Sequence, residues 1–139
     1  MKSLKTIFHF LALLAMTILP AATVLAQKAP KAPKVIAIVN RADWCGTCMA
    51  HGPRVMALIP GYAGKAIVFA LNDLSNAATV AASKERLTKL GVENIQGPMI
   101  YTGVILLVDA SSHQVLKTVS MSEPTSQIQA EITAALARK

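Results

Sequence analysis

Several features that define common classes of protein are missing from this chain of 139 residues. It has no internal repeats. Aromatic residues make up 4% of the composition against a net charge of +7, and no basic face interleaved with aromatic side chains is present, which argues against nucleic-acid binding. Only two cysteines occur, and neither lies near the N-terminus. We therefore expect no nucleic-acid partner and no lipid-anchored N-terminal cysteine.

The N-terminal segment lacks the length of a membrane-spanning helix. Two lysines precede a short apolar run over residues 7–19, and small residues before Gln27 fit a signal-peptidase site after Ala26. Because the run is short for a membrane span, we expect residues 1–26 to be a cleaved signal peptide, with an uncleaved N-terminal anchor as the alternative. The mature protein is then periplasmic or secreted.

The rest of the chain has the size of one small domain. Residues 27–33 are rich in Lys, Ala and Pro and show no periodicity, so they are expected to form a linker. Residues 34–139 are expected to form the folded domain, and we expect it to be a monomer.

Apolar runs and turn residues alternate along this domain. Strands are predicted at residues 34–39, 66–71, 103–108 and 114–119, and helices at about 45–62, at 77–90 and from about 124. The order β-α-β-α-β-β-α predicts an α/β fold with a central mixed β-sheet flanked by helices.

The two cysteines, Cys45 and Cys48, lie between the first apolar strand and the helix that follows it. A helix N-terminus provides unpaired N–H groups and a partial positive charge, which stabilise a thiolate on the first cysteine. A static disulfide and a metal site are the alternatives. Because so short a loop contributes little stability in the chain-entropy model, the spacing favours a disulfide that is made and broken.

Asp43 and Trp44 precede the Cys-Gly-Thr-Cys motif, and Pro53 follows Cys48 by five residues. This arrangement resembles the thioredoxin family over residues 34–139. The resemblance implies a thioredoxin-like fold and a thiol:disulfide oxidoreductase that acts on protein thiols and disulfides. It also implies no cofactor other than the Cys45–Cys48 disulfide. The motif differs by one residue from the reducing thioredoxin loop, which favours a reductase supplied by a membrane or exported electron donor.

The resemblance also assigns roles at the site. Cys45 is expected to be the exposed nucleophile, and Cys48 the more buried thiol that resolves the mixed disulfide. Trp44, Gly46 and Thr47 are expected to contribute to substrate binding, Trp44 as a platform beside the disulfide.

Two positions depart from the family pattern. Val39 stands where thioredoxins often carry a buried Asp, and Ala70 or a neighbour replaces the lysine that pairs with it. The position of the substrate-binding cis-proline is also open. Thr102 or Gly103 falls there by counting back from the hairpin turn, and Pro98 is the nearest proline.

His51 lies one helical turn beyond Cys48. Cys45, Cys48 and His51 therefore define an alternative function, a copper-binding or copper-delivery protein, because Cu(I) prefers soft ligands. We favour an ordinary helix histidine and expect no metal.

Overall fold

The structure is a computed structural model that describes residues 32–95 and 101–138. The expected signal peptide, most of the expected linker and Pro98 lie outside the described residues. Within these two ranges, no helix is both long enough and apolar enough to cross a lipid bilayer.

The described residues form the order of strands and helices that the sequence predicts. The elements are β1 (Val35–Arg41), α1 (Gly46–Met56), a 3-10 helix (Ile59–Tyr62), β2 (Ile67–Asp73), α2 (Ala77–Lys89), β3 (Val104–Asp109), β4 (Val115–Ser120) and α3 (Thr125–Ala137).

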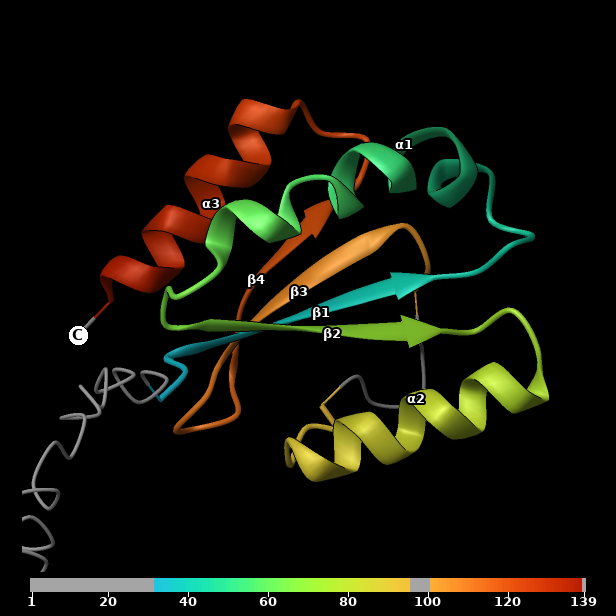
Figure 1. The fold of residues 1–139 in the computed structure, drawn as a ribbon, viewed down its shortest axis with the longest axis horizontal. Coiled ribbons are helices and arrows are strands. Elements are labelled where there is room, and N and C mark those ends of the chain that lie inside the picture. The colour runs from blue at the N-terminus through green and yellow to red at the C-terminus, as the bar shows by residue number, and fades with distance from the viewer. Residues whose placement is uncertain (1–31, 96–100, 139) are drawn as a thin grey trace, which may run out of the picture.

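The four strands of the described part form one sheet in the order β2-β1-β3-β4. β1 pairs with β2 in parallel and with β3 in antiparallel, and β3 pairs with β4 in antiparallel. Figure 1 shows α1 and α3 on one face of this mixed sheet and α2 on the other. The predicted fold class is therefore confirmed.

Every residue of β1 except the last is buried, because helices cover both faces of the sheet. Alternate residues of the strand point to opposite faces. Val35, Ala37 and Val39 belong to the buried cluster beneath α1 and α3. Ile36 and Ile38 belong to the cluster beneath α2. The site described below lies at the end of the first cluster.

The predicted extent of the first helix is wrong at its C-terminal end. α1 ends at Met56, and a separate 3-10 helix begins at Ile59. Pro60 accounts for the break, because it has no N–H to donate to the Met56 carbonyl four residues earlier. Pro53 lies inside α1.

Local side-chain bonds fix the other boundaries. Asn76 caps α2 by accepting from the N–H groups of Ala78 and Thr79. In the β3–β4 turn, the Asp109 carboxylate accepts from the N–H groups of Ser111 and Ser112 at 2.9 and 2.8 Å. A hydrogen bond from the Ser111 hydroxyl, together with these two bonds, holds the pKa of Asp109 well below its usual range. The hairpin expected at this turn is therefore confirmed.

Candidate redox site

Cys45 and Cys48 form a disulfide at the N-terminus of α1. Cys45 is the N-cap residue, in an extended conformation, and Cys48 lies in the first turn. The Cys48 N–H donates a hydrogen bond of 3.1 Å to the Cys45 sulfur. A helix-terminal N–H is thus directed at the sulfur that would carry negative charge after reduction.

The two cysteines are buried to nearly the same extent, with exposed fractions of 7% and 5% for Cys45 and Cys48. The expected exposure of Cys45 is therefore wrong, whereas Cys48 is the more buried of the two by a small margin. Gly103 lies against Cys45, and Thr47 lies against Gly103. Trp44, immediately before it, is 64% exposed. Part of the exposed surface next to the buried disulfide is therefore provided by Trp44.

One side of the disulfide is closed by Gly103. Its φ angle is +76°, and a Cβ built there would lie 3.0 Å from Thr47 Cγ2 and 3.6 Å from Cys45 Sγ. The Gly103 N–H donates to the Asn40 carbonyl at 2.9 Å, and the Gly103 carbonyl accepts from Met121 N–H at 2.8 Å. The backbone of β1 and the residue after β4 thus hold Gly103 against the disulfide.

Among the candidates for the cis-proline position, Gly103 is the residue that the structure places against Cys45. Thr102 precedes it in the chain, and Pro98 lies outside the described residues. The described residues contain no cis peptide bond. Gly46, at the start of α1, is exposed, and a Cβ built there would meet no atom within 4 Å. The substrate-binding roles of these residues stay predictions.

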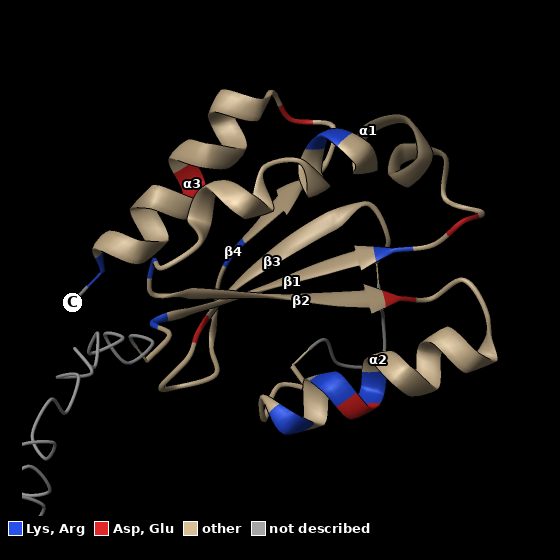
Figure 2. Ribbon diagram, viewed as in Figure 1, with Lys and Arg blue, Asp and Glu red and all other residues tan. Residues whose placement is uncertain are grey.

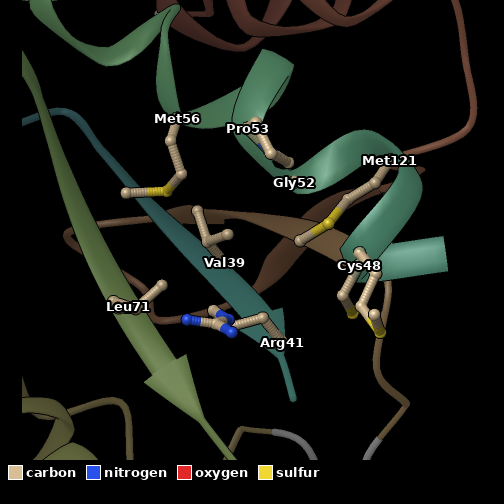
Figure 3. A pocket seen from close by; sticks show the side chains of 9 residues that line it. Val39, Arg41, Cys48, Gly52, Pro53, Met56, Leu71 and Met121 are labelled. Carbon is tan, nitrogen blue, oxygen red and sulfur yellow. The ribbon is translucent and has the colours of Figure 1, made fainter. Parts of the chain in front are cut away.

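The other side of the disulfide opens into a cavity of about 270 Å³ beside Cys48 (Figure 3). Its walls are mostly apolar and include three methionines. The cavity is lined by Val39, Arg41, Cys48, Met49, Gly52, Pro53, Met56, Leu71 and Met121.

Val39, which replaces the buried Asp of the family pattern, lines this cavity. Its partner in the β1–β2 register is Leu71, which lines the same cavity. Ala70 instead belongs to the cluster beneath α2. The place of an acid–base pair is therefore filled by two aliphatic side chains, Val39 and Leu71.

An ion pair lies next to the apolar part of the cavity, where β1 and β2 end. Arg41 Nη1 lies 3.3 Å from Asp73 Oδ2, and Figure 2 shows the basic end of β1 beside the acidic end of β2. Desolvation disfavours the Asp73 carboxylate, but hydrogen bonds from Ser75 and the charge of Arg41 outweigh it and lower the pKa of Asp73. Asp73 is thus held as an anion beside Arg41.

Ser75 connects this ion pair to the loop before the disulfide. Its N–H donates to Asp73 Oδ1 at 3.0 Å, and its hydroxyl donates to the same oxygen. The Ser75 hydroxyl oxygen accepts from the Asp43 N–H at 2.9 Å. The Leu74 N–H donates to the Arg41 carbonyl at 2.8 Å. The end of β2 therefore anchors the loop that carries Trp44.

His51 is half-buried on α1. Among the described residues, no three side chains of His, Cys, Asp or Glu come together in a group that would hold a metal ion. Within residues 32–95 and 101–138, no third ligand of these types therefore joins Cys45 and Cys48.

Sequence reasoning missed Arg41, Asp73, Ser75 and the methionines of the cavity. The sequence contained one signal for the ion pair, because Arg41 and Asp73 follow apolar strands that were predicted to be parallel neighbours. Their opposite charges could therefore be expected side by side at one edge of the sheet. The methionines carry no comparable signal, because they come from α1 and from the segment after β4.

No protein-family model matches the chain, and no curated protein sequence matches it. Solved structures do match. The solution structure of a putative thioredoxin from Neisseria meningitidis has a TM-score of 0.50 at 16% identity, over 75% of each chain. A thioredoxin of Malassezia sympodialis has a TM-score of 0.48 at 22% identity, over 78% of this chain and 82% of its own. Thioredoxin f2 of Chlamydomonas reinhardtii has a TM-score of 0.46 at 16% identity, over 78% and 85%. The Neisseria structure and the sheet order give this chain a thioredoxin-like fold.

Proposed function

We propose that this chain, with its thioredoxin-like fold, is a thiol:disulfide oxidoreductase that exchanges the Cys45–Cys48 disulfide with protein thiols and disulfides. The observation that carries this function is the disulfide at the N-terminus of α1, with the Cys48 N–H bonded to the Cys45 sulfur. That N–H stabilises negative charge on Cys45 once the disulfide is reduced.

In the reducing direction, the Cys45 thiolate attacks one sulfur of a substrate disulfide, and the other substrate sulfur leaves as a thiolate. Cys48 then loses its proton and attacks Cys45, which releases the second substrate thiolate. Two electrons pass to the substrate, and the Cys45–Cys48 disulfide re-forms. Since Val39 supplies no carboxylate beside Cys48, water or a polar neighbour has to accept the Cys48 proton.

We propose reduction as the physiological direction, because the Cys-Gly-Thr-Cys loop differs by one residue from the reducing thioredoxin loop. A membrane or exported electron donor then restores the dithiol, and the protein acts as a monomer. Trp44 is highly exposed next to the disulfide, which supports its proposed role as a platform for the substrate. Gly103 and Thr47 would form the opposite wall of that platform.

The experiment is reduction of insulin disulfides in the presence of dithiothreitol, with trapping of mixed disulfides. Cys48→Ser should accumulate mixed disulfides with substrate, whereas Cys45→Ser should form none. Both variants should lose catalytic turnover. Faster alkylation of Cys48 than of Cys45 in the reduced wild-type protein would contradict the assigned order of attack.

The location is also a proposal. Residues 1–26 act as a signal peptide, and the exported protein begins at Gln27 in the periplasm or outside the cell. Intact-mass analysis of the protein from the exported fraction tests this. A mass that retains residues 1–26 would make the segment an N-terminal anchor.

A further inference from the structure

We propose that Arg41 sets the redox equilibrium of the Cys45–Cys48 pair by placing a positive charge on the cavity beside Cys48, with Asp73 holding and partly offsetting that charge. This assignment rests on the thiol–disulfide exchange proposed above. It concerns how readily the pair is oxidised rather than which substrate it meets.

The cavity places Arg41 and Cys48 in one shared space. Among the described residues that line it, Arg41 alone carries a formal charge, and most of the other side chains are apolar. Val39, Cys45, Cys48 and Met121 also belong to one buried cluster. An apolar surrounding screens a charge poorly, so the field of Arg41 reaches the sulfur more strongly than it would through water.

Asp73 keeps the guanidinium in place. The two side chains are register partners at the ends of β1 and β2 and are exposed to 39% and 17%. In Figure 3 the Arg41 side chain extends toward Leu71 on β2. The Asp73 backbone is itself fixed, because its N–H donates to the Ser83 hydroxyl at 2.8 Å. Solvent reaches Arg41, which limits the size of its effect.

The two charges act on the sulfurs in opposite directions. A cation beside the dithiol favours its thiolate form, which stabilises the reduced protein and makes the disulfide easier to reduce. Asp73 counteracts this effect, but it does not line the cavity, so Arg41 has the stronger influence. Removing Arg41 and removing Asp73 should therefore shift the equilibrium in opposite senses. A purely structural role would not produce opposite shifts.

The experiment is redox titration of the purified chain with glutathione. The protein dithiol gives two electrons and two protons to glutathione disulfide, which yields the protein disulfide and two molecules of glutathione. The equilibrium constant for protein oxidation is read from Trp44 fluorescence and from alkylation of free thiols. No protein substrate is present. A chain that fails to reduce insulin but shows the expected shifts would therefore contradict only the proposed function.

We expect Arg41→Gln to raise this constant about threefold and Asp73→Asn to lower it by a smaller factor, as partly screened charges at different distances would do. Arg41→Lys should stay near wild type because it keeps the charge. Lys117→Gln is the matched control, since Lys117 lies 3.3 Å from Glu131 in a pair of similar exposure between β4 and α3. Its constant should not change.

Ser75→Ala separates charge from loop anchoring, because it removes the bond to the Asp43 N–H without removing a charge. It should leave the constant near wild type. The assignment is overturned if Arg41→Gln leaves the constant unchanged, or if Arg41→Gln and Asp73→Asn shift it in the same sense. If Arg41→Gln fails to fold, the test becomes a comparison of Asp73→Asn with the control Lys117→Gln. A lower oxidation constant for Asp73→Asn than for Lys117→Gln supports the role of Arg41, and an equal or higher constant overturns it.

Discussion

The two sides of the Cys45–Cys48 disulfide are built in opposite ways. On one side, Gly103 leaves so little space that an added Cβ would lie 3.0 Å from Thr47. On the other side, a cavity of about 270 Å³ separates Cys48 from the ends of β1 and β2. The first side fixes the position of the disulfide by backbone contact. The second side leaves space for substitutions that change the size, polarity or charge of the side chains lining the cavity.

The two sides are also formed by different kinds of contact. The closed side is held by two backbone hydrogen bonds, one from the Gly103 N–H to the Asn40 carbonyl and one from the Met121 N–H to the Gly103 carbonyl. The open side is bordered by methionines, including Met49 and Met56, whose long unbranched side chains adapt to different neighbours. Substitutions on the closed side should therefore act through strain, and those on the open side through polarity, volume and charge.

The largest expected effect comes from placing a charge on the open side. Val39→Asp should destabilise the fold by about 3 kcal/mol, because Val39 is buried and Arg41 is already paired with Asp73. We do not expect it to speed insulin reduction at neutral pH. Urea denaturation measures the free energy of unfolding.

Val39→Asn is the control for this change, since it has the same shape without the charge. The new carboxyl would have a raised pKa in the folded state, because burial disfavours its ionised form. The excess cost of Asp over Asn should therefore shrink as the pH falls. A Val39→Asp variant as stable as wild type and several-fold faster with insulin would show that the cavity solvates a charge.

A smaller effect is expected on the closed side. Gly103→Ala should cost about 2 kcal/mol, because it combines a strained positive φ with contact against Thr47. Gly64→Ala is the matched control: Gly64 has a φ of +75° and no atom within 4 Å of an added Cβ, so it reports the strain alone.

A double-mutant cycle then isolates the contact with the Thr47 methyl group, while the Thr47 Cβ, 3.1 Å from the added Cβ, is kept. Thr47→Ser removes the methyl group that an added Cβ would meet, so Gly103→Ala should cost less in that background. Equal costs for Gly103→Ala and Gly64→Ala in thermal denaturation would mean that the closed side has more room than its geometry indicates.

Filling the open side should have a modest stabilising effect. Val39→Ile adds one methylene group to the cavity and should raise the free energy of unfolding by up to about 1 kcal/mol. Val35→Ile is the control on the same strand and face, because Val35 is buried but does not line the cavity. It should be neutral or destabilising. If both changes lower the melting temperature equally, the cavity offers no usable space.

The smallest effect concerns the ion pair at the edge of the open side. Because the pKa of Asp73 is lowered in the folded state, its contribution is present above the unfolded value of about 4 and is lost as the pH falls through the folded value. Asp73→Asn should cost about 0.5 kcal/mol at pH 7 and progressively less as the pH falls through the folded pKa of Asp73. Urea denaturation at pH 7, 5, 3 and 2 measures this, and a difference that does not change with pH would contradict it.

The sequence alone predicted the parts of the molecule that depend on local signals. The order of strands and helices follows from runs of apolar residues, and Asn76 and Asp109 mark their boundaries by bonds to nearby N–H groups. The position of Cys45 at a helix N-terminus could likewise be predicted from the residues next to it in the chain.

The parts that could not be predicted depend on contacts between distant segments. The pairing of Val39 with Leu71 rather than with Ala70 follows from the strand register, which a one-residue shift would reverse. The burial of Cys45 depends on Gly103, more than fifty residues later in the chain. The cavity depends on side chains from α1, two strands and the segment after β4.

The position of β1 in the sheet has a consequence for the nascent chain during translation. β1 is the first of the described strands to leave the ribosome, yet it lies between two others, and its partners extend to Asp73 on β2 and Asp109 on β3. Until those residues are synthesised, an apolar strand of high β-propensity has unpaired backbone groups on both edges. The nascent chain is therefore exposed to aggregation until most of the domain has been translated.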